Sequence, residues 1–220
     1  MVSLVSPIAA QRAACHDWRI VPGVRVVPIT AAGTEPDLRR AFGDSAVVNE
    51  EVDVGEGMTE PGTVIYKRDP SRALSILWDG EGANKHPATI FICYGLAEGS
   101  CRWQTGDGIR FGTTLRELEA LNRKPFVLTG FGWDYSGTVV SWEEGELARK
   151  LEGRGRLLLR LLPRADKDGE TIPRLTPKEY GEVSGDRDIS SSHAVMRKLD
   201  PAVYNMVFEF PKRARKQPGG

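Results

Sequence analysis

The sequence is poor in the residues that most often carry catalysis or bind metals. It contains three histidines and three cysteines in 220 residues. His16, His86 and His193 lie far apart, and neither a His-x-x-x-His nor a Cys-x-x-Cys spacing is present to hold zinc. Glycine-rich loops of the kinds that cradle nucleotide phosphates are missing as well. We therefore predict neither a cofactor nor a metal site.

The sequence also lacks a long apolar run and a net charge. No run approaches the 18 apolar residues of a membrane-spanning helix. Lys plus Arg and Asp plus Glu number 30 each, so charge gives no reason to expect a nucleic-acid partner. Apolar residues at 40% and charged residues at 27% are typical of a globular protein. The basic tail, residues 212–220, is expected to be solvated and disordered.

The start of the chain contains Ala13-Ala14-Cys15, which resembles the end of a bacterial lipoprotein signal. This resemblance implies a lipid on Cys15 and a signal remnant over residues 1–17. Two features depart from the pattern, because Arg12 stands where Leu is usual and a basic leader is missing. A frayed N-terminus is the alternative.

The other two cysteines, Cys93 and Cys101, lie eight residues apart. A strand followed by a short loop can bring such a pair together, so we predict a disulfide. A loop of this length would stabilise the fold by roughly 2–3 kcal/mol. A disulfide favours an exported protein. Three unrelated reduced cysteines in a cytosolic protein are the alternative.

Two short helices are predicted from their capping residues. The first covers residues 34–43, beginning at a threonine N-cap and ending at a glycine. The second follows Thr113 or Thr114. Glu117 completes a capping box with Thr114, and Asn122 is expected to end the helix in a left-handed conformation.

Short β-branched and aromatic segments predict four strands after each helix. The first half contains 46–52, 63–66, 73–78 and 88–93, and the second contains 126–129, 138–142, 156–162 and 203–210. Residues 18–29 are expected to form an edge strand or lead-in, and residues 54–62 an exposed loop.

The repeated order of elements predicts an α+β fold of two tandem units, each a short helix with a four-stranded antiparallel sheet. The first unit is expected over 18–95 and the second over 109–211, joined by a linker at 96–108. Within the second unit, the polar segment 163–201 is predicted to be an irregular flap with a short helix at 193–199. Loops of this length are usually functional or mobile.

The best candidate binding surface is the segment Gly-Phe-Gly-Trp-Asp-Tyr-Ser-Gly at 130–137. If it is a strand, Phe131, Trp133 and Tyr135 share one face, and Trp142 joins them from the next strand. Such rigid aromatic groups are favoured in binding surfaces. The alternative is that these rings form the core of the second half.

Two further segments are candidate sites. The acidic residues between 44 and 60 suit a basic partner or a cation, or form a solvated loop. Within the flap, Ser190-Ser-Ser-His193 with Asp186 or Asp188 supplies the residue types of a hydrolase. The alternative is that these residues cap a helix.

The helix-plus-meander layout resembles the β-lactamase-inhibitor proteins and the small outer-membrane assembly lipoproteins of bacteria. At the level of motif, the likeness is carried by residues 112–121 and 130–142. The segment at 130–137 is also similar to one in uncharacterised exported bacterial proteins. These resemblances imply a non-enzymatic binding protein of the envelope, located in the periplasm or anchored at the outer membrane, with a protein or envelope component as its partner. A hydrolase under the 163–201 flap and a cytoplasmic location are the alternatives.

Overall fold

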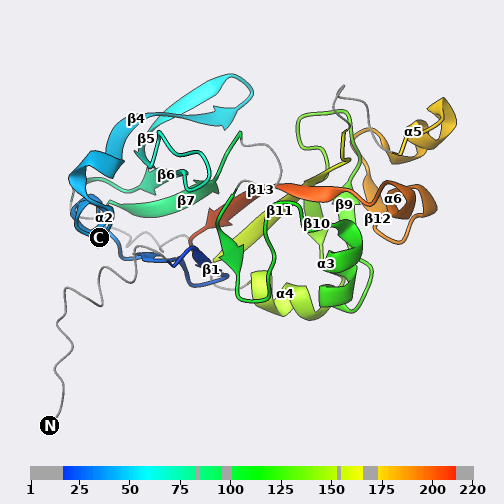
Figure 1. Cartoon of the computed structure of the whole chain (residues 1–220), viewed down its shortest axis with the longest axis horizontal. Coiled ribbons are helices and arrows are strands. Elements are labelled where there is room, and N and C mark those ends of the chain that lie inside the picture. Colours follow the sequence, from blue (N-terminus) through cyan, green and yellow to red (C-terminus); the bar gives the residue numbers. More distant parts are fainter. Residues whose placement is uncertain (1–16, 83–84, 96–100, 153–154, 166–172, 212–220) are drawn as a thin grey trace, which may run out of the picture.

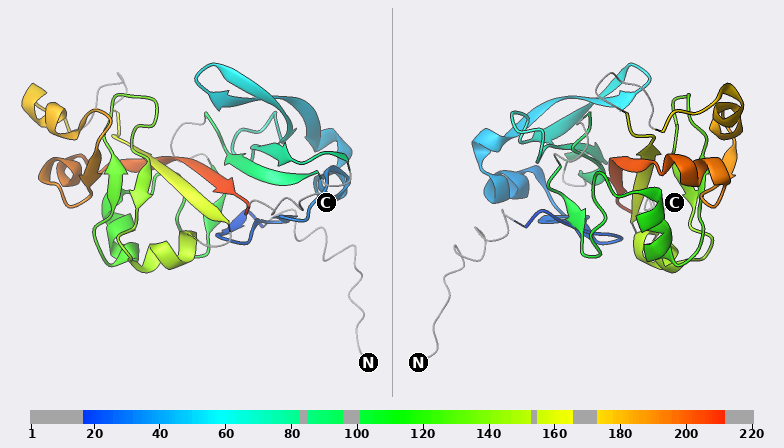
Figure 2. Two further views of the ribbon diagram at one scale, coloured as in Figure 1. Left: turned by 180° about the vertical axis from the view of Figure 1, so that it is seen from behind. Right: turned by 45° about the vertical axis from the view of Figure 1, so that its right-hand side comes forward.

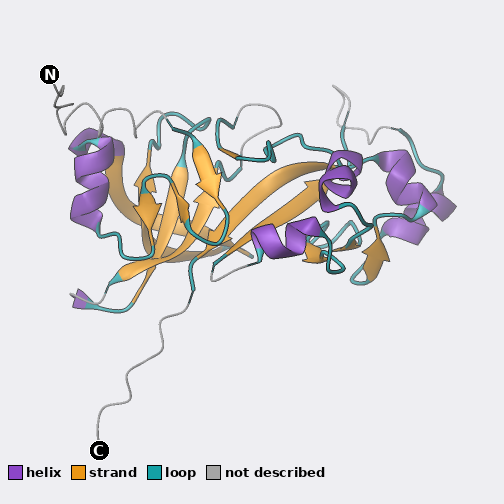
Figure 3. Ribbon diagram, turned by 90° about the horizontal axis from the view of Figure 1, so that it is seen from below, coloured by secondary structure: helices purple, strands orange, loops and turns teal. Residues whose placement is uncertain are grey.

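The computed structural model describes residues 17–82, 85–95, 101–152, 155–165 and 173–211. Over these residues the fold is α+β, with five α-helices and three sheets. Figure 1 shows the largest sheet running across the molecule, and Figure 3 shows helices gathered at its two ends. Cys15 and the tail 212–220 lie outside the described residues.

Helix α2 (Glu35–Phe42) leads into the largest sheet. Thr34 and Asp37 form the capping box at its start, since the Thr34 hydroxyl accepts from the Asp37 N–H and the Asp37 carboxylate accepts from the Thr34 N–H. Gly43, at φ 90°, ends the helix. The predicted bounds of this helix are therefore confirmed.

The four strands that follow form an antiparallel meander: β4 (Val47–Gly55), β5 (Met58–Ile65), β6 (Leu74–Asp79) and β7 (His86–Ile92). The predicted loop at 54–62 is wrong, because these residues are mostly strand. Glu56 and Gly57 both have positive φ and turn β4 directly into β5. The acidic, glycine-rich composition hid this hairpin, which arches above the sheet in Figures 1 and 2.

Strands from the second half of the chain extend the same sheet. β13 (Ala202–Glu209) pairs with β7, and β11 (Arg156–Leu162) pairs with β13, which gives the order β11-β13-β7-β6-β5-β4. The buried side chains of both halves also belong to one core cluster. The expected layout of two units, each with its own four-stranded sheet, is therefore not confirmed.

The remaining predicted strands of the second half form a separate small sheet. β9 (Val127–Thr129) lies between β10 (Val139–Ser141) and β12 (Asp188–Ser190). The described part of the 163–201 segment contains β12 and two helices, α5 (Pro177–Val183) and α6 (Ala194–Leu199). Helix α6 confirms the short helix predicted at 193–199, whereas α5 and β12 were not predicted. Burial of Val183 and Ile189 holds these elements against the rest of the fold.

Helices α3 (Leu115–Asn122) and α4 (Glu146–Leu151) lie on the side of the second half opposite the hairpin (Figure 1). The capping box of Thr114 and Glu117 is confirmed. Asn122 does not take the left-handed conformation, which falls on Arg123 at φ 59°. Asn122 is instead fully buried and bonds to the start of α4.

A third sheet, at the N-terminal side, has the order β3-β2-β1-β8, where β1 is Arg19–Val21, β2 is Arg25–Val26, β3 is Ile29–Thr30 and β8 is Gln104–Thr105. It accounts for the expected edge segment at 18–29.

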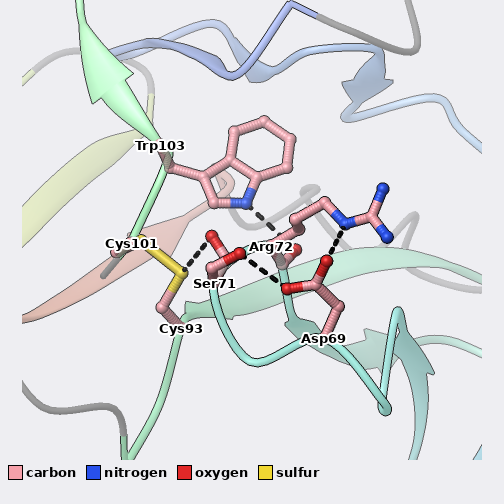
Figure 4. The surroundings of a disulfide bond; sticks show 6 residues. All are labelled: Asp69, Ser71, Arg72, Cys93, Cys101 and Trp103. Atoms are coloured by element: carbon pink, nitrogen blue, oxygen red, sulfur yellow. Dashed lines mark hydrogen bonds and ion pairs between the residues drawn. A yellow bond between two sulfur atoms is a disulfide. The ribbon is translucent and has the colours of Figure 1, made fainter.

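The structure pairs Cys93 with Cys101, which is the disulfide that the spacing predicts. Figure 4 shows the bond beside the turn between β5 and β6. Arg102 donates its N–H to the Ser71 carbonyl at 2.8 Å, and the Trp103 indole donates to the Arg72 carbonyl at 3.1 Å. The disulfide therefore helps to hold residues 101–103 against this turn.

Candidate functional site

The four aromatic residues predicted to form a binding surface do not share one exposed face. Phe131 and Trp142 are 4% and 3% exposed, which matches the alternative that these two rings belong to the core. Two backbone hydrogen bonds hold Phe131 in this position. Its N–H donates to the Val183 carbonyl, and its carbonyl accepts from the Gly185 N–H. The Trp142 ring packs on Phe126 with centroids 5.0 Å apart.

The segment between these residues is a loop and not a strand. Gly132 and Gly137 have φ of 84° and 65°, which break the alternation that a strand requires. Trp133 is half-buried and Tyr135 is 48% exposed at the loop tip. Tyr135 is thus the most exposed member of the predicted surface.

The loop is held in one shape by its own hydrogen bonds. The hydroxyls of Thr129 and Thr138 both donate to the Tyr135 carbonyl, at 2.7 and 2.8 Å. The Ser136 hydroxyl accepts from the Trp133 N–H at 2.9 Å, and the Trp133 indole donates to the Gly130 carbonyl. These bonds fix the position of Tyr135 without support from a strand.

Tyr135 stands at the edge of a groove on the large sheet. One face of this sheet carries the core, whereas the other carries half-buried side chains from the four strands β6, β7, β13 and β11. The pairing registers align these side chains in two rows, which are Ser75-Phe91-Val207-Leu158 and Leu77-Thr89-Glu209-Arg156. A pocket of about 510 Å³ lies on these rows, with Tyr135 and Val140 at its side. Pockets of this volume suit small ligands or short segments of chain.

The hairpin of β4 and β5 reaches Tyr135 across the groove. The Tyr135 hydroxyl donates to the Glu56 carboxylate at the hairpin tip, over 3.1 Å. This hydrogen bond and the nearby negative charge raise the pKa of the Tyr135 phenol above its ordinary value. The hairpin tip and the loop at 130–137 are therefore joined at their most exposed points.

The groove contains polar groups that differ in how well they are paired. Arg156 forms an ion pair with Glu209 at 2.6 Å. Arg160 lies beside Tyr135, with its guanidinium carbon 5.3 Å from the ring centroid. Asn205, on the neighbouring strand, is 7% exposed, and its side-chain oxygen has no hydrogen-bond partner. An unpaired buried polar atom is uncommon and calls for an explanation.

A second hollow, of about 1130 Å³, lies at the other end of the sheet, where Tyr66 and Arg72 are among the residues that line it. Its Arg72 guanidinium sits 4.2 Å from the Tyr66 ring centroid, and its Nε lies 2.6 Å from Asp69. The Ser71 hydroxyl and the arginine charges lower the pKa of Asp69. Because Arg72 is already paired, this hollow is the weaker candidate site.

The residues of the predicted hydrolase are engaged in local structure. His193 Nδ1 accepts from the Val195 N–H at the start of α6, and its Nε2 lies 3.9 Å from Glu182. The Ser190 and Ser192 hydroxyls bond to each other at 2.8 Å. The Ser191 hydroxyl donates to Glu119 at 2.6 Å. The His193 contact matches the capping alternative, since this side chain caps α6.

The acidic segment at 44–60 forms contacts along the hairpin. Glu50 pairs with Lys67, and the Asp53 carboxylate accepts from the Gly55 N–H. In the part of the chain that the structure describes, no three Asp, Glu, His or Cys side chains gather as metal ligands.

Sequence reasoning placed Glu56 only within the acidic segment at 44–60 and missed Arg160 and Asn205. A signal for the last two was present, because β11 and β13 place a polar residue every fourth position among apolar ones, at Arg156 and Arg160 and at Asn205 and Glu209. Residues four apart in a strand share a face. The place of Glu56 beside Tyr135, 79 residues away, depends on the tertiary fold.

Comparison with protein-family models, with curated proteins and with solved structures gave no match to the chain. Over the described residues, none of the helices has both the length and the apolar character that crossing a membrane requires.

Proposed function

We propose that the chain is a non-enzymatic binding protein of the bacterial envelope, with its ligand on the open face of the large sheet. The observation that carries this proposal is the groove beside Tyr135, whose hydroxyl is held by the Glu56 carboxylate of the hairpin tip. Its floor combines half-buried apolar side chains with a few polar groups, which is the usual composition of a ligand pocket. The proposal does not require the two halves to be related by duplication, which stays a hypothesis.

The envelope location rests on the disulfide between Cys93 and Cys101, since such bonds persist in oxidising compartments. Lipidation of Cys15 is part of this proposal. Mass spectrometry of the mature N-terminus in the native host tests it, because a lipidated Cys15 gives a defined mass increase. An unprocessed N-terminus on a protein recovered with reduced cysteines would overturn the envelope location.

A matched pair of variants on β11 tests the groove. Leu158 is half-buried on the groove floor, whereas Leu162 is 43% exposed and does not line the pocket. Leu158→Lys should remove ligands or proteins that the purified chain retains from an envelope extract, and Leu162→Lys should retain them. Quantitative mass spectrometry of the retained material gives the readout, and circular dichroism verifies folding. Equal retention by both variants would contradict a site in this groove.

The hydrolase remains the alternative function, with less support from the geometry. Activity profiling over ester, glycoside and phosphate substrates, with His193→Ala as the comparison, separates the two. An activity that disappears in His193→Ala while the helix content is kept would favour the enzyme.

A further inference from the structure

The inference concerns the end of the groove nearest Tyr135 and rests on the proposed binding function. Arg160 and Asn205 are direct partners across β11 and β13 and both line the pocket. They therefore present a charged and an uncharged polar group side by side on its floor.

Among the residues that the structure describes, the Arg160 guanidinium has donors that are largely unused. Its one polar contact among the described residues is a long one, 3.4 Å, to the Asp134 carbonyl. The same described residues place no carboxylate within 4.0 Å of it, whereas Arg156, four residues earlier on the same strand, is paired with Glu209. The Tyr135 ring beside it keeps the guanidinium in place by a cation–π contact.

Asn205 adds a second group with unused capacity. Its side chain is more than nine-tenths buried. Its Oδ1 has no hydrogen-bond partner and is itself covered by protein, so the amide must rotate to turn this oxygen toward the pocket. A carboxamide offers both a donor and an acceptor, so its natural complement is another amide, which offers the same two. Its burial makes a missing partner costly, and a ligand that supplies one is favoured.

The surrounding surface defines the rest of the ligand. Phe91, Leu158 and Val207 form a half-buried apolar floor next to these two residues. A planar guanidinium binds a carboxylate in a bidentate geometry, with two parallel N–H···O hydrogen bonds. A free carboxylate, an adjacent amide and an apolar side chain occur together in the last residue of a peptide.

We propose that this pocket recognises the C-terminal residue of a peptide with an apolar side chain. Arg160 binds the terminal carboxylate, Asn205 pairs with the preceding amide, and the side chain lies on Phe91, Leu158 and Val207. The pocket volume of about 510 Å³ is sufficient for this residue and part of the one before it.

Fluorescence anisotropy of the whole chain with labelled peptides tests the proposal. The probes are Gly-Ser-Gly-Ala-Leu labelled at its N-terminus, the same peptide with an amidated C-terminus, and unlabelled N-acetyl-leucine as competitor. We expect the free acid to bind at least tenfold more tightly than the amide. Arg160→Gln should remove this difference, and Arg160→Lys should reduce it. Arg149→Gln, which changes an exposed charge on α4 away from the pocket, should keep it.

The outcomes separate this inference from the proposed function. Equal binding of the free acid and the amide, abolished by Leu158→Lys, would support the groove and overturn carboxylate recognition. Binding of N-acetyl-leucine as tight as that of the peptide would replace the peptide with a free acylamino acid. An absence of binding by all three probes would overturn the inference, while retention of material by the unmodified chain but not by Leu158→Lys would still support the groove. Thermal melting of each variant shows whether a loss reflects unfolding.

Discussion

Gly137 shows how a single residue positions the candidate site. Its φ is 65°, and a Cβ added to it would lie 1.8 Å from the Leu161 carbonyl oxygen. The Leu161 N–H donates to the Gly137 carbonyl at 2.9 Å, so the loop that carries Tyr135 rests directly on β11. Glycine at this position lets the small sheet and the large sheet meet.

We expect Gly137→Ala to lower the free energy of unfolding by more than about 2 kcal/mol, because it adds backbone strain to a clash with main-chain atoms. Urea denaturation gives the measurement. Gly106→Ala is the control, since a Cβ there meets no atom within 4 Å and its φ is not in the left-handed range. A Gly137→Ala variant as stable as the control would show that the loop can move away from β11.

Glu179 is a second residue whose surroundings lead to a measurable property. Lys198 donates to its carboxylate at 2.5 Å, and the backbone and hydroxyl of Thr176 donate at 2.8 and 2.9 Å. In that order, these contacts lower the pKa of Glu179 from 4.5 to about 2. The carboxylate therefore links the start of α5 to α6.

A lowered pKa in the folded state means that these contacts stabilise α5 above pH 4.5 and are lost as the pH falls toward about 2. We expect an NMR titration of the Glu179 side chain to have its midpoint well below 4.5. Lys198→Gln should move the midpoint upward. A wild-type midpoint near 4.5 would contradict the link between the two helices.

At the scale of elements, Asn122 connects two helices and a strand. Its side chain donates to the carbonyls of Lys124 and Trp142 and accepts from the Leu147 N–H. The donor–acceptor distance is 3.0 Å in all three hydrogen bonds. Gly145 approaches so closely that a Cβ there would lie 2.1 Å from the Asn122 oxygen. The end of α3 and the start of α4 therefore depend on one buried amide.

Asn122→Ala should destabilise the fold by on the order of 3 kcal/mol, since three hydrogen bonds are lost and buried backbone groups are left unpaired. Chemical denaturation measures the change. Asn49→Ala is the matched control, because Asn49 is exposed on β4 and its amide bonds to the Glu35 and Thr63 side chains and not to helix-end backbone groups. A similar small effect for both variants would show that water or a neighbouring group replaces the Asn122 bonds.

At the scale of the whole molecule, the β7–β13 pairing joins the two halves into one sheet. The disulfide lies just past the end of β7 and ties residues 101–103 to the turn between β5 and β6. The cross-link joins residues eight positions apart, and it therefore lowers the conformational entropy of the unfolded chain.

Replacing both Cys93 and Cys101 by Ala should lower the free energy of unfolding by about 2–3 kcal/mol, because the unfolded chain regains the entropy of a short closed loop. Denaturation with and without a reductant measures it. The reductant should weaken the wild type and leave the double variant unchanged. Equal stability of the oxidised wild type and the double variant would contradict a stabilising role.

Local patterns in the sequence were sufficient for some of the elements, but not for the β4–β5 hairpin, α4, α5 or β12. The N-cap at Thr34 and the capping box at Thr114 follow from residues close in sequence, and β11 follows from five leucines within seven residues. The disulfide follows from the spacing of Cys93 and Cys101. All of these features depend on near neighbours along the chain, which the sequence displays directly.

The assignment of strands to sheets and the composition of the groove were decided by tertiary structure. Whether Phe131 and Trp142 face the core or the solvent depends on backbone turns at glycines and on distant partners such as Val183. Tyr135 meets Glu56, and Arg160 meets Asn205, because strands remote in sequence pair in one register. Such pairings are set by the packing of the whole core, and no local pattern of residues contains that information.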